Sequence, residues 1–279
     1  MKKPKVSVLL GVLNQEDYLS ACIESVLAQT FSDFEFIILN DGSTDRTWEI
    51  IQEYAKKDSR IRPFSFPEKQ GIAVGCNFTV AQAKGDYLAR IDGDDIWKPE
   101  KLEKQVAYLE EHPECGVCFT QVEIIDGQGK IVHGAECDFM DEVYLQKNRS
   151  QHEWLLKLFC SGNCFAHTAS LIRRSAYQKV CGYRNAFRQL PDFDLWLQLI
   201  QVCEFYIIEQ KLLQCRRHKE NTSIRDSIGA NRTYQEYFQL YLHLFSTMDL
   251  AFFSKAFSSL FRFPKASTPE ELECEQAFL

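Results

Sequence analysis

Three carboxylates stand within four residues at the end of an apolar segment. Asp92, Asp94 and Asp95 follow residues 87–91 (YLARI). Carboxylates crowded in this way repel one another unless a cation lies among them. A hard divalent ion such as Mg²⁺ or Mn²⁺ prefers oxygen ligands and often binds through one or two carboxylates and substrate phosphates. The spacing therefore predicts a divalent-cation site that is shared with a phosphate-bearing ligand.

A second acidic turn, residues 40–45 (NDGSTD), follows the apolar segment 34–39 (FEFIIL). Asp and Gly are common in turns of every kind, and Asp45 is also a suitable helix cap. This turn alone therefore fits a structural role as well as a ligand site. Gly42 and Gly93 lack side chains, so we expect them to let a ligand approach the backbone closely.

The first third of the chain alternates strand and helix patterns, which predicts a doubly wound α/β fold with a mainly parallel sheet. In such sheets, ligands bind at the carboxyl ends of the strands, where both acidic turns would meet. The predicted strands are residues 6–12, 34–39, 61–66 and 86–91, with apolar helical spacing between them.

The pattern changes after residue 115. Residues 116–125 and a stretch after Lys130 resemble two strands joined by a hairpin turn at 126–129 (DGQG). Helical patterns return further along, and the tail from about residue 227 is rich in Phe and Tyr. We expect the tail to form helices that pack on the body or on a partner. The helical patterns before the tail cover residues 152–159, 174–180 and 192–203.

The composition is that of an ordinary globular protein, with 279 residues, of which 45% are hydrophobic and 25% charged. The net charge of −7 argues against general binding to nucleic acid or to anionic membranes. The 11 cysteines are scattered, and no apolar stretch is long enough for a signal peptide or a spanning helix. These features predict a protein of the reducing cytoplasm.

Other site motifs are weak. Cys115-Gly-Val-Cys118 has the spacing of zinc ligands, but no second pair follows, and residues three apart on a strand point to opposite faces. Gly71 and Gly75 do not form a P-loop, because no Gly-Lys-Ser/Thr follows.

The sequence resembles the family 2 glycosyltransferases, which are inverting enzymes of the GT-A fold that use nucleotide-sugar donors. The match extends from residue 5 to about residue 220 in the family's order. It is carried by residues 5–10 (KVSVLL) with Asn14, 22–31 (CIESVLAQTF), 40–45 (NDGSTD), 85–102 (GDYLARIDGDDIWKPEKL) and 192–197 (DFDLWL).

The resemblance implies roles for individual acids. Asp41 matches the residue that contacts the nucleotide base. Asp92 and Asp94 match the DxD motif, whose first acid faces the ribose and whose last faces the metal and diphosphate. Asp95 is placed to share this Mn²⁺ or Mg²⁺ ion. Asp192 matches the proposed general base, although Pro191 stands where an acid often precedes it.

Further expectations concern donor and acceptor binding. Asn14 stands beside the base pocket, in a segment that departs from the family pattern, as does Asn40 at the second strand's end. The basic cluster Arg216, Arg217 and His218 fits closure over the donor diphosphate, but a solvated basic loop fits equally. His167 is a weak candidate for the acceptor pocket.

The resemblance implies a GT-A domain at residues 1–225, and the tail outside the resemblance is expected to form a helical C-terminal extension at 226–279. Within the domain, residues 1–115 would bind the nucleotide sugar and residues 116–225 the acceptor. The expected activity is inverting sugar transfer, most readily from a UDP-sugar, to a saccharide or lipid-linked acceptor of the cell envelope. The extension would contact a membrane face, from the cytoplasmic side, or a second copy. Two alternatives stay open: a sugar-phosphate nucleotidyltransferase and a catalytically silent nucleotide-sugar-binding protein.

Overall fold

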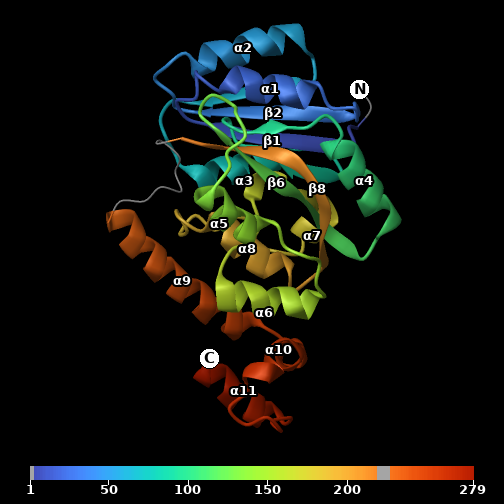
Figure 1. Ribbon diagram of the computed structural model, residues 1–279, viewed down its shortest axis with the longest axis vertical. Coiled ribbons are helices and arrows are strands. Elements are labelled where there is room, and N and C mark those ends of the chain that lie inside the picture. The colour runs from blue at the N-terminus through green and yellow to red at the C-terminus, as the bar shows by residue number, and fades with distance from the viewer. Residues whose placement is uncertain (1–2, 219–226) are drawn as a thin grey trace.

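The computed structural model describes residues 3–218 and 227–279, which are arranged around an eight-stranded mixed sheet (Figure 1). The strand order is β3-β2-β1-β4-β7-β6-β8-β5. The strands are β1 (Val6–Val12), β2 (Phe34–Asp41), β3 (Ile61–Phe66), β4 (Tyr87–Arg90), β5 (Ile96–Trp97), β6 (Cys115–Asp126), β7 (Leu171–Arg173) and β8 (Glu204–Arg217).

Helices cover the sheet on both faces, with α1 and α2 on one side of β1 and β2 and α3 on the other (Figure 1). This accounts for the continuous apolar character of β1 and β2, which are buried along almost their whole length. The helices are α1 (Leu19–Leu27), α2 (Thr47–Lys57), α3 (Ile72–Gln82), α4 (Lys101–Glu111), α5 (Ala135–Tyr144), α6 (Gln151–Ser161), α7 (Arg174–Tyr177), α8 (Pro191–Leu199), α9 (Ser227–Thr247), α10 (Leu250–Phe257) and α11 (Pro269–Phe278).

The direction of the strands decides which loops meet. Strands β1 to β4 are parallel, so their carboxyl ends lie along one edge of the sheet. Strand β7 is antiparallel to both β4 and β6, and β8 is parallel to β6. Two reversals restore the original direction, so β6 and β8 also end at the edge where β4 ends. The four predicted N-terminal strands and the α/β class are therefore confirmed.

The expected hairpin turn at residues 126–129 is present, but the second strand that was expected after Lys130 is not formed in full. Residues beyond β6 return only as far as a single antiparallel bridge between Ile125 and Ile131, and the partner of β6 is β8. The sequence pattern did not reveal β8, because the strand is half-exposed and carries charged residues such as Glu204, Glu209 and Lys211 along its length. The place of β8 in the sheet is therefore determined by its pairing with β6 and β5, and no apolar sequence pattern indicates it.

The C-terminal extension is helical, as expected. Helix α9 runs along the body, and α10 and α11 lie at the far end of the molecule from the sheet (Figure 1). Helix α9 contacts α8, and α10 contacts α6. Phe159 of α6 makes edge-on ring contacts with Tyr241, Phe245 and Phe257, which join the extension to the body through aromatic packing.

Within the described ranges, none of the helices has both the length and the apolar character that crossing a membrane requires.

Candidate functional site

The acidic turn between β4 and β5 holds its three carboxylates in three different settings. Asp92 is half-exposed and accepts a hydrogen bond from Arg90 Nη2 at 2.7 Å. The Oδ2 atom of Asp94 lies 3.0 Å from Nε2 of His218. Asp95 is buried, and its two oxygens accept from Thr168 Oγ1 at 2.7 Å and from the Arg216 N–H at 3.0 Å. Asp95 therefore anchors the turn to the neighbouring segments.

The electrostatics of this turn favour a bound cation. Desolvation raises the pKa of Asp92, with Arg90 acting against the rise and Asp94 adding to it. Burial, followed by repulsion from Asp94 and Asp92, raises the pKa of Asp95 well above its usual range. The charge of Arg90 does not fully compensate the three acids, so a positive ion would stabilise them.

The carboxylate oxygens of Asp92 and Asp94 fit a hard divalent ion, and the imidazole of His218 is compatible with Mn²⁺. In residues 3–218 and 227–279, however, no group of three or more His, Cys, Asp or Glu side chains is arranged to hold a metal ion. The protein side chains fit a cation whose remaining ligands come from a substrate, and a diphosphate supplies such oxygens.

Arg90 places a positive charge at this turn, and it was not recognised as a site residue from the sequence. Its side chain is buried, its Nη1 donates to the Leu9 carbonyl at 3.4 Å, and its Nε has no hydrogen-bond partner. A lone arginine in an otherwise apolar strand is the sequence signal that would have singled it out, because buried arginines are almost always paired.

The loops after β1 and β2 are tied to each other by Asn14. Its N–H donates to Ser43 Oγ at 2.9 Å, and its Oδ1 accepts from the Thr44 N–H at 2.9 Å. Asn14 adopts a left-handed backbone conformation with φ of 51°, which asparagine tolerates better than most residues. The structure thus brings Asn14 to the carboxyl edge, where it shapes the turn at 40–45.

Asp41, at the end of β2, is buried, and its carboxylate already accepts two backbone hydrogen bonds. The donors are the N–H groups of Gln70 at 2.7 Å and Gly71 at 3.0 Å, just before α3. Asp41 therefore holds the segment before α3 against the end of β2, and this position lies on the same sheet edge as Asp92.

The chain itself comes close to Gly42 and Gly93, and the approach of a ligand to these two glycines stays a prediction. A Cβ on Gly42 would lie 2.5 Å from the backbone carbon of Glu68, and φ there is +75°. A Cβ on Gly93 would lie 2.8 Å from a methyl carbon of Val12. Both glycines allow neighbouring loops to pack together.

The basic cluster at the end of β8 lies against the acidic turn. The buried Arg216 donates from Nε to the Asp94 carbonyl at 2.9 Å and from Nη1 to the Asp126 carbonyl at 3.0 Å, and its guanidinium lies over the Tyr18 ring. His218 also packs against Tyr18, with ring centroids 4.9 Å apart. Arg217 is half-buried. Through these contacts Arg216 and His218 fix the geometry around Asp94.

Asp192 lies in the first turn of α8, directly after Pro191 at the first helical position. It is half-buried, and its Oδ2 accepts from Asn163 Nδ2 at 2.8 Å. Desolvation raises the pKa of Asp192 to about 6, although the Phe193 N–H and Asn163 favour the charged form. Asp92 contributes to the rise, so both acids share one electrostatic environment. A carboxylate with this pKa is suited to accept a proton near neutral pH.

Asp194 differs from Asp192 although only two residues separate them. Asp194 is fully buried and forms an ion pair with Arg184, whose Nε donates to its Oδ2 at 2.8 Å. Gln198 Nε2 donates to the same oxygen at 3.0 Å. This confirms Asp194 as a structural acid.

His167 is half-buried, and its contacts are with other side chains of the body. Its Nε2 is 2.7 Å from the Tyr183 hydroxyl, and its ring meets Trp196 edge-on. Burial, followed by the nearby charge of Arg90, lowers the pKa of His167 well below its usual range, so the ring is neutral. This setting favours a role in packing and hydrogen bonding.

Two further residues that support Asp192 could not be recognised in the sequence. Asn163 hydrogen-bonds the carboxylate from the loop after α6. Glu236, buried on α9, accepts hydrogen bonds from the N–H groups of Arg188, Gln189 and Leu190, the residues just before α8. Asn and Glu at such positions carry no sequence signal, since each acts on a segment 29 or more residues away.

Sequence comparison identifies relatives of the whole α/β domain. Residues 7–181 match the family model for glycosyl transferase family 2. A protein named as a glycosyltransferase, EpsE of Bacillus subtilis, is 36% identical over 201 residues, which cover 71% of this chain and 67% of EpsE. The O-antigen biosynthesis glycosyltransferase WbnJ of Escherichia coli is 28% identical over 221 residues, covering 78% of this chain and 81% of WbnJ.

Structural comparison identifies the fold as GT-A. The structure of S. aureus TarS 1–349 in complex with UDP superimposes with a TM-score of 0.67 at 17% identity, covering 92% of this chain and 71% of that chain. The mannosyltransferase PcManGT of Pyrobaculum calidifontis, in complex with GDP-Man and Mn²⁺, gives a TM-score of 0.65 at 14% identity, covering 99% of this chain and 74% of that chain.

Proposed function

Since the chain belongs to glycosyl transferase family 2, we propose that it transfers a sugar from a nucleotide-sugar donor to an acceptor hydroxyl, with inversion at the anomeric carbon. The acceptor is a saccharide or glycolipid of the cell envelope, as the O-antigen role in the name of WbnJ supports. The donor is a UDP-sugar, a choice supported by the UDP and UDP-GlcNAc complexes of TarS.

The observation that carries this proposal is the setting of Asp192. Its carboxylate is half-buried at a helix N-terminus, is held by Asn163, and has a pKa of about 6. We assign Asp192 as the general base that takes the proton from the acceptor hydroxyl as its oxygen attacks the anomeric carbon. Asn163 keeps the second oxygen occupied, so the remaining lone pairs can face the hydroxyl.

The acidic turn forms the donor side of the proposed site. Asp94, together with the ligand's phosphates, would hold Mn²⁺ or Mg²⁺, and such an ion neutralises charge that develops on a diphosphate leaving group. Arg90 orients Asp92 towards the ribose, and His218 keeps Asp94 in place. Asp95 supports the metal site from behind, since Thr168 and the Arg216 N–H occupy its oxygens. Asp41 and Asn14 position the loops around the nucleotide base.

The proposed division of the chain follows the two substrates of the reaction. We propose residues 1–115 as the donor half, 116–225 as the acceptor half and 226–279 as an added helical unit. Family membership favours glycosyl transfer over a nucleotidyltransferase reaction. A catalytically silent sugar-nucleotide-binding protein is the remaining alternative, and the experiment below separates it from an enzyme.

The test combines nucleotide binding with transfer. Calorimetric titration with UDP, GDP and dTDP is carried out with Mn²⁺ and then with EDTA, and transfer from the matching sugar nucleotide is followed with envelope saccharides as acceptors. Asp94→Asn should lose metal-dependent nucleotide binding. Asp192→Asn should bind nucleotide normally and lose transfer by at least about 100-fold, which is the usual contribution of a general base.

Glu209→Gln is the matched control, because it removes an exposed carboxylate in the middle of β8. It should bind and transfer like the unmodified protein. Transfer by Asp192→Asn at the parent rate would refute the base assignment. If the unmodified protein and all variants fail to transfer sugar, while the unmodified protein binds nucleotide in a metal-dependent way, the silent binding protein is favoured.

A further inference from the structure

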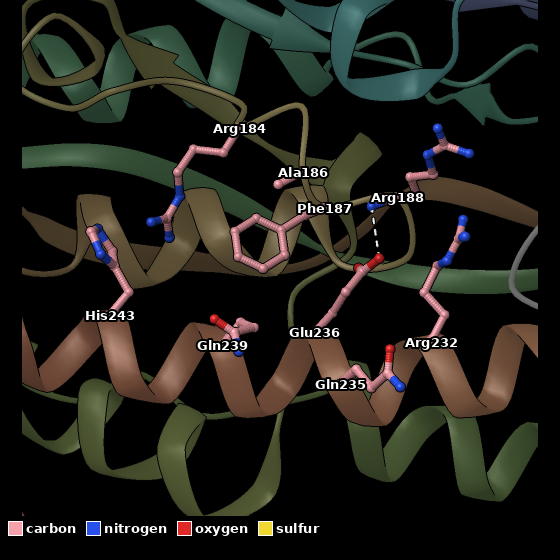
Figure 2. Close-up of a pocket in the computed structure, with 9 residues that line it drawn as sticks. All are labelled: Arg184, Ala186, Phe187, Arg188, Arg232, Gln235, Glu236, Gln239 and His243. Carbon is pink, nitrogen blue, oxygen red and sulfur yellow. Dashed lines mark hydrogen bonds between the residues drawn. The ribbon is translucent and has the colours of Figure 1, made fainter.

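A cavity of about 550 Å³ lies between the segment before α8 and helix α9 (Figure 2). One wall is formed by residues 184–188, and the other by the face of α9 that carries Arg232, Glu236 and His243. The second wall belongs to the C-terminal extension, outside the residues that match the family model. Both walls lie C-terminal to the residues that match the family model, so the match itself assigns the cavity no role.

Three arginines line the cavity, and they differ in how their charge is balanced. Arg184 is paired with the buried Asp194. Arg188 and Arg232 are exposed, and within the described part of the chain neither forms an ion pair. In Figure 2, Arg184 and His243 lie at one end of the cavity, and Arg188 and Arg232 lie at the other. Two guanidinium groups thus face solvent beside one concave surface.

The acid in the cavity does not neutralise this charge directly. The Glu236 carboxylate accepts the N–H groups of Arg188, Gln189 and Leu190 at 2.8–3.0 Å, so its oxygens are turned towards the backbone. Figure 2 shows the first of these bonds. Burial and Arg184 lower the pKa of His243, so its ring adds little charge at neutral pH. Gln235 and Gln239 supply neutral amide donors from the same helix.

The cavity lies close to the proposed general base. Arg188 is four residues before Asp192, and an extended chain spans at most about 3.6 Å per residue, which places their backbones within about 14 Å. One wall of the cavity and the proposed general base therefore lie on neighbouring parts of one chain segment. The segment that connects them is held by Glu236 and continues directly into α8.

We propose that this cavity binds an anionic group, a phosphate or a carboxylate, carried by the acceptor a short distance from its attacking hydroxyl. The inference rests on the proposed glycosyl transfer and names the acceptor class as an anionic saccharide. Arginine is suited to this task, since its planar guanidinium offers paired donors to the oxygens of carboxylate or phosphate. In a protein of net charge −7, local cations are needed to attract such an acceptor.

Binding of defined anions to the full chain tests this proposal. The probes are tetragalacturonate for the carboxylate and a glycerol phosphate oligomer for the phosphate, and methyl-esterified tetragalacturonate is the neutral control. Each is titrated calorimetrically at low salt, both on the free protein and on the protein saturated with its nucleotide and Mn²⁺. At least one anionic probe should bind, the neutral ester should not, and added salt should weaken binding.

Arg188→Gln and Arg232→Gln should each weaken binding of that probe by about tenfold, the usual effect of losing a charge-assisted hydrogen bond. Lys255→Gln, which removes an exposed charge on α10 of the same extension, should leave it unchanged. Nucleotide affinity should be equal in all variants. Failure of both probes to bind, or binding in both arginine variants as tight as in the unmodified protein, would overturn the inference. Nucleotide binding in those same samples reports separately on the proposed function.

Discussion

Two aspartates in one helix show how strongly the surroundings of a side chain decide its use. Asp192 and Asp194 both stand in the first turn of α8, where the helix dipole favours a carboxylate. Asp194 is buried against Arg184 and serves the fold. Desolvation raises the pKa of both carboxyls, but the hydrogen-bond donors of Asp192 are neutral, the Asn163 amide and the Phe193 N–H, and its pKa rises to about 6. The acid without a cationic partner is the one that can exchange a proton near neutral pH.

The pH dependence of transfer should report this carboxyl. A general base must be ionised, so kcat/KM should fall about tenfold for each pH unit below about 6, and be level just above it. The measurement is the rate of transfer between pH 4.5 and 8, with nucleotide affinity followed over the same range as a control. An acid limb that coincides with loss of nucleotide binding would instead assign the titration to the donor side.

At the scale of elements, the packing of α9 against the segment before α8 is what links the extension to the site. A single buried carboxylate, Glu236, accepts three successive backbone N–H groups there. These bonds fix the path of the chain as it enters the helix that carries Asp192. Glu275 on α11 forms a comparable pair of bonds, to the N–H groups of Arg262 and Phe263, but far along the chain from α8.

This pair of glutamates makes a matched experiment. Glu236→Gln and Glu275→Gln should both lower the free energy of unfolding, by about 1–3 kcal/mol, because each weakens charge-assisted bonds of a buried group. Only Glu236→Gln should lower kcat, by about tenfold, with nucleotide affinity unchanged, since misplacement of a base acts on the chemical step. Urea unfolding measures the stability of both variants. If the two variants are equally stable and also have equal kcat values, α9 has no positioning role.

At the scale of the whole molecule, the core includes a buried lysine whose contacts are with uncharged groups. Lys101 of α4 is fully buried, its Nζ lies 4.1 Å from the centre of the Trp97 ring, and it donates to Gln105 Oε1 at 2.9 Å. Gln105 in turn donates to the Cys118 and Ala169 carbonyls, which joins α4 to β6 and to the segment before β7. Burial lowers the pKa of Lys101 to about 7.

This lysine should make the stability of the protein depend on pH. Between about pH 7 and 10.5 the unfolded chain holds a proton on Lys101 that the folded chain releases, so the contribution of Lys101 to the free energy of unfolding rises with pH. Relative to Lys101→Met, the unmodified protein should gain about 2 kcal/mol between pH 7 and 9. Urea unfolding at both pH values measures this. Lys104→Met is the control, at a half-exposed position one turn further along α4, and its difference from the unmodified protein should not change with pH. If the difference in the free energy of unfolding between Lys101→Met and the unmodified protein is the same at both pH values, the assignment is contradicted.

Local patterns in the sequence determined much of the fold. Continuous apolar segments identified β1 and β2, because strands that are covered on both faces need apolar residues at nearly every position. The alternation of strand and helix patterns identified β3 and β4. The same reasoning placed the acidic turns at one sheet edge and Asp192 at a helix start. The resemblance of these segments to family 2 glycosyltransferases identified the family, because the motifs lie in its order along the chain.

Only the tertiary structure decided what each polar group contacts. It showed that Asp41 holds the segment before α3, that Arg216 is turned towards backbone carbonyls, and that Gly42 and Gly93 admit neighbouring loops. It also brought Glu236 to the segment before α8. Such contacts join residues far apart in the chain, and they depend on loop paths and strand directions. Hydrophobic periodicity reports only how one element meets the core, so it carries no information about these pairings.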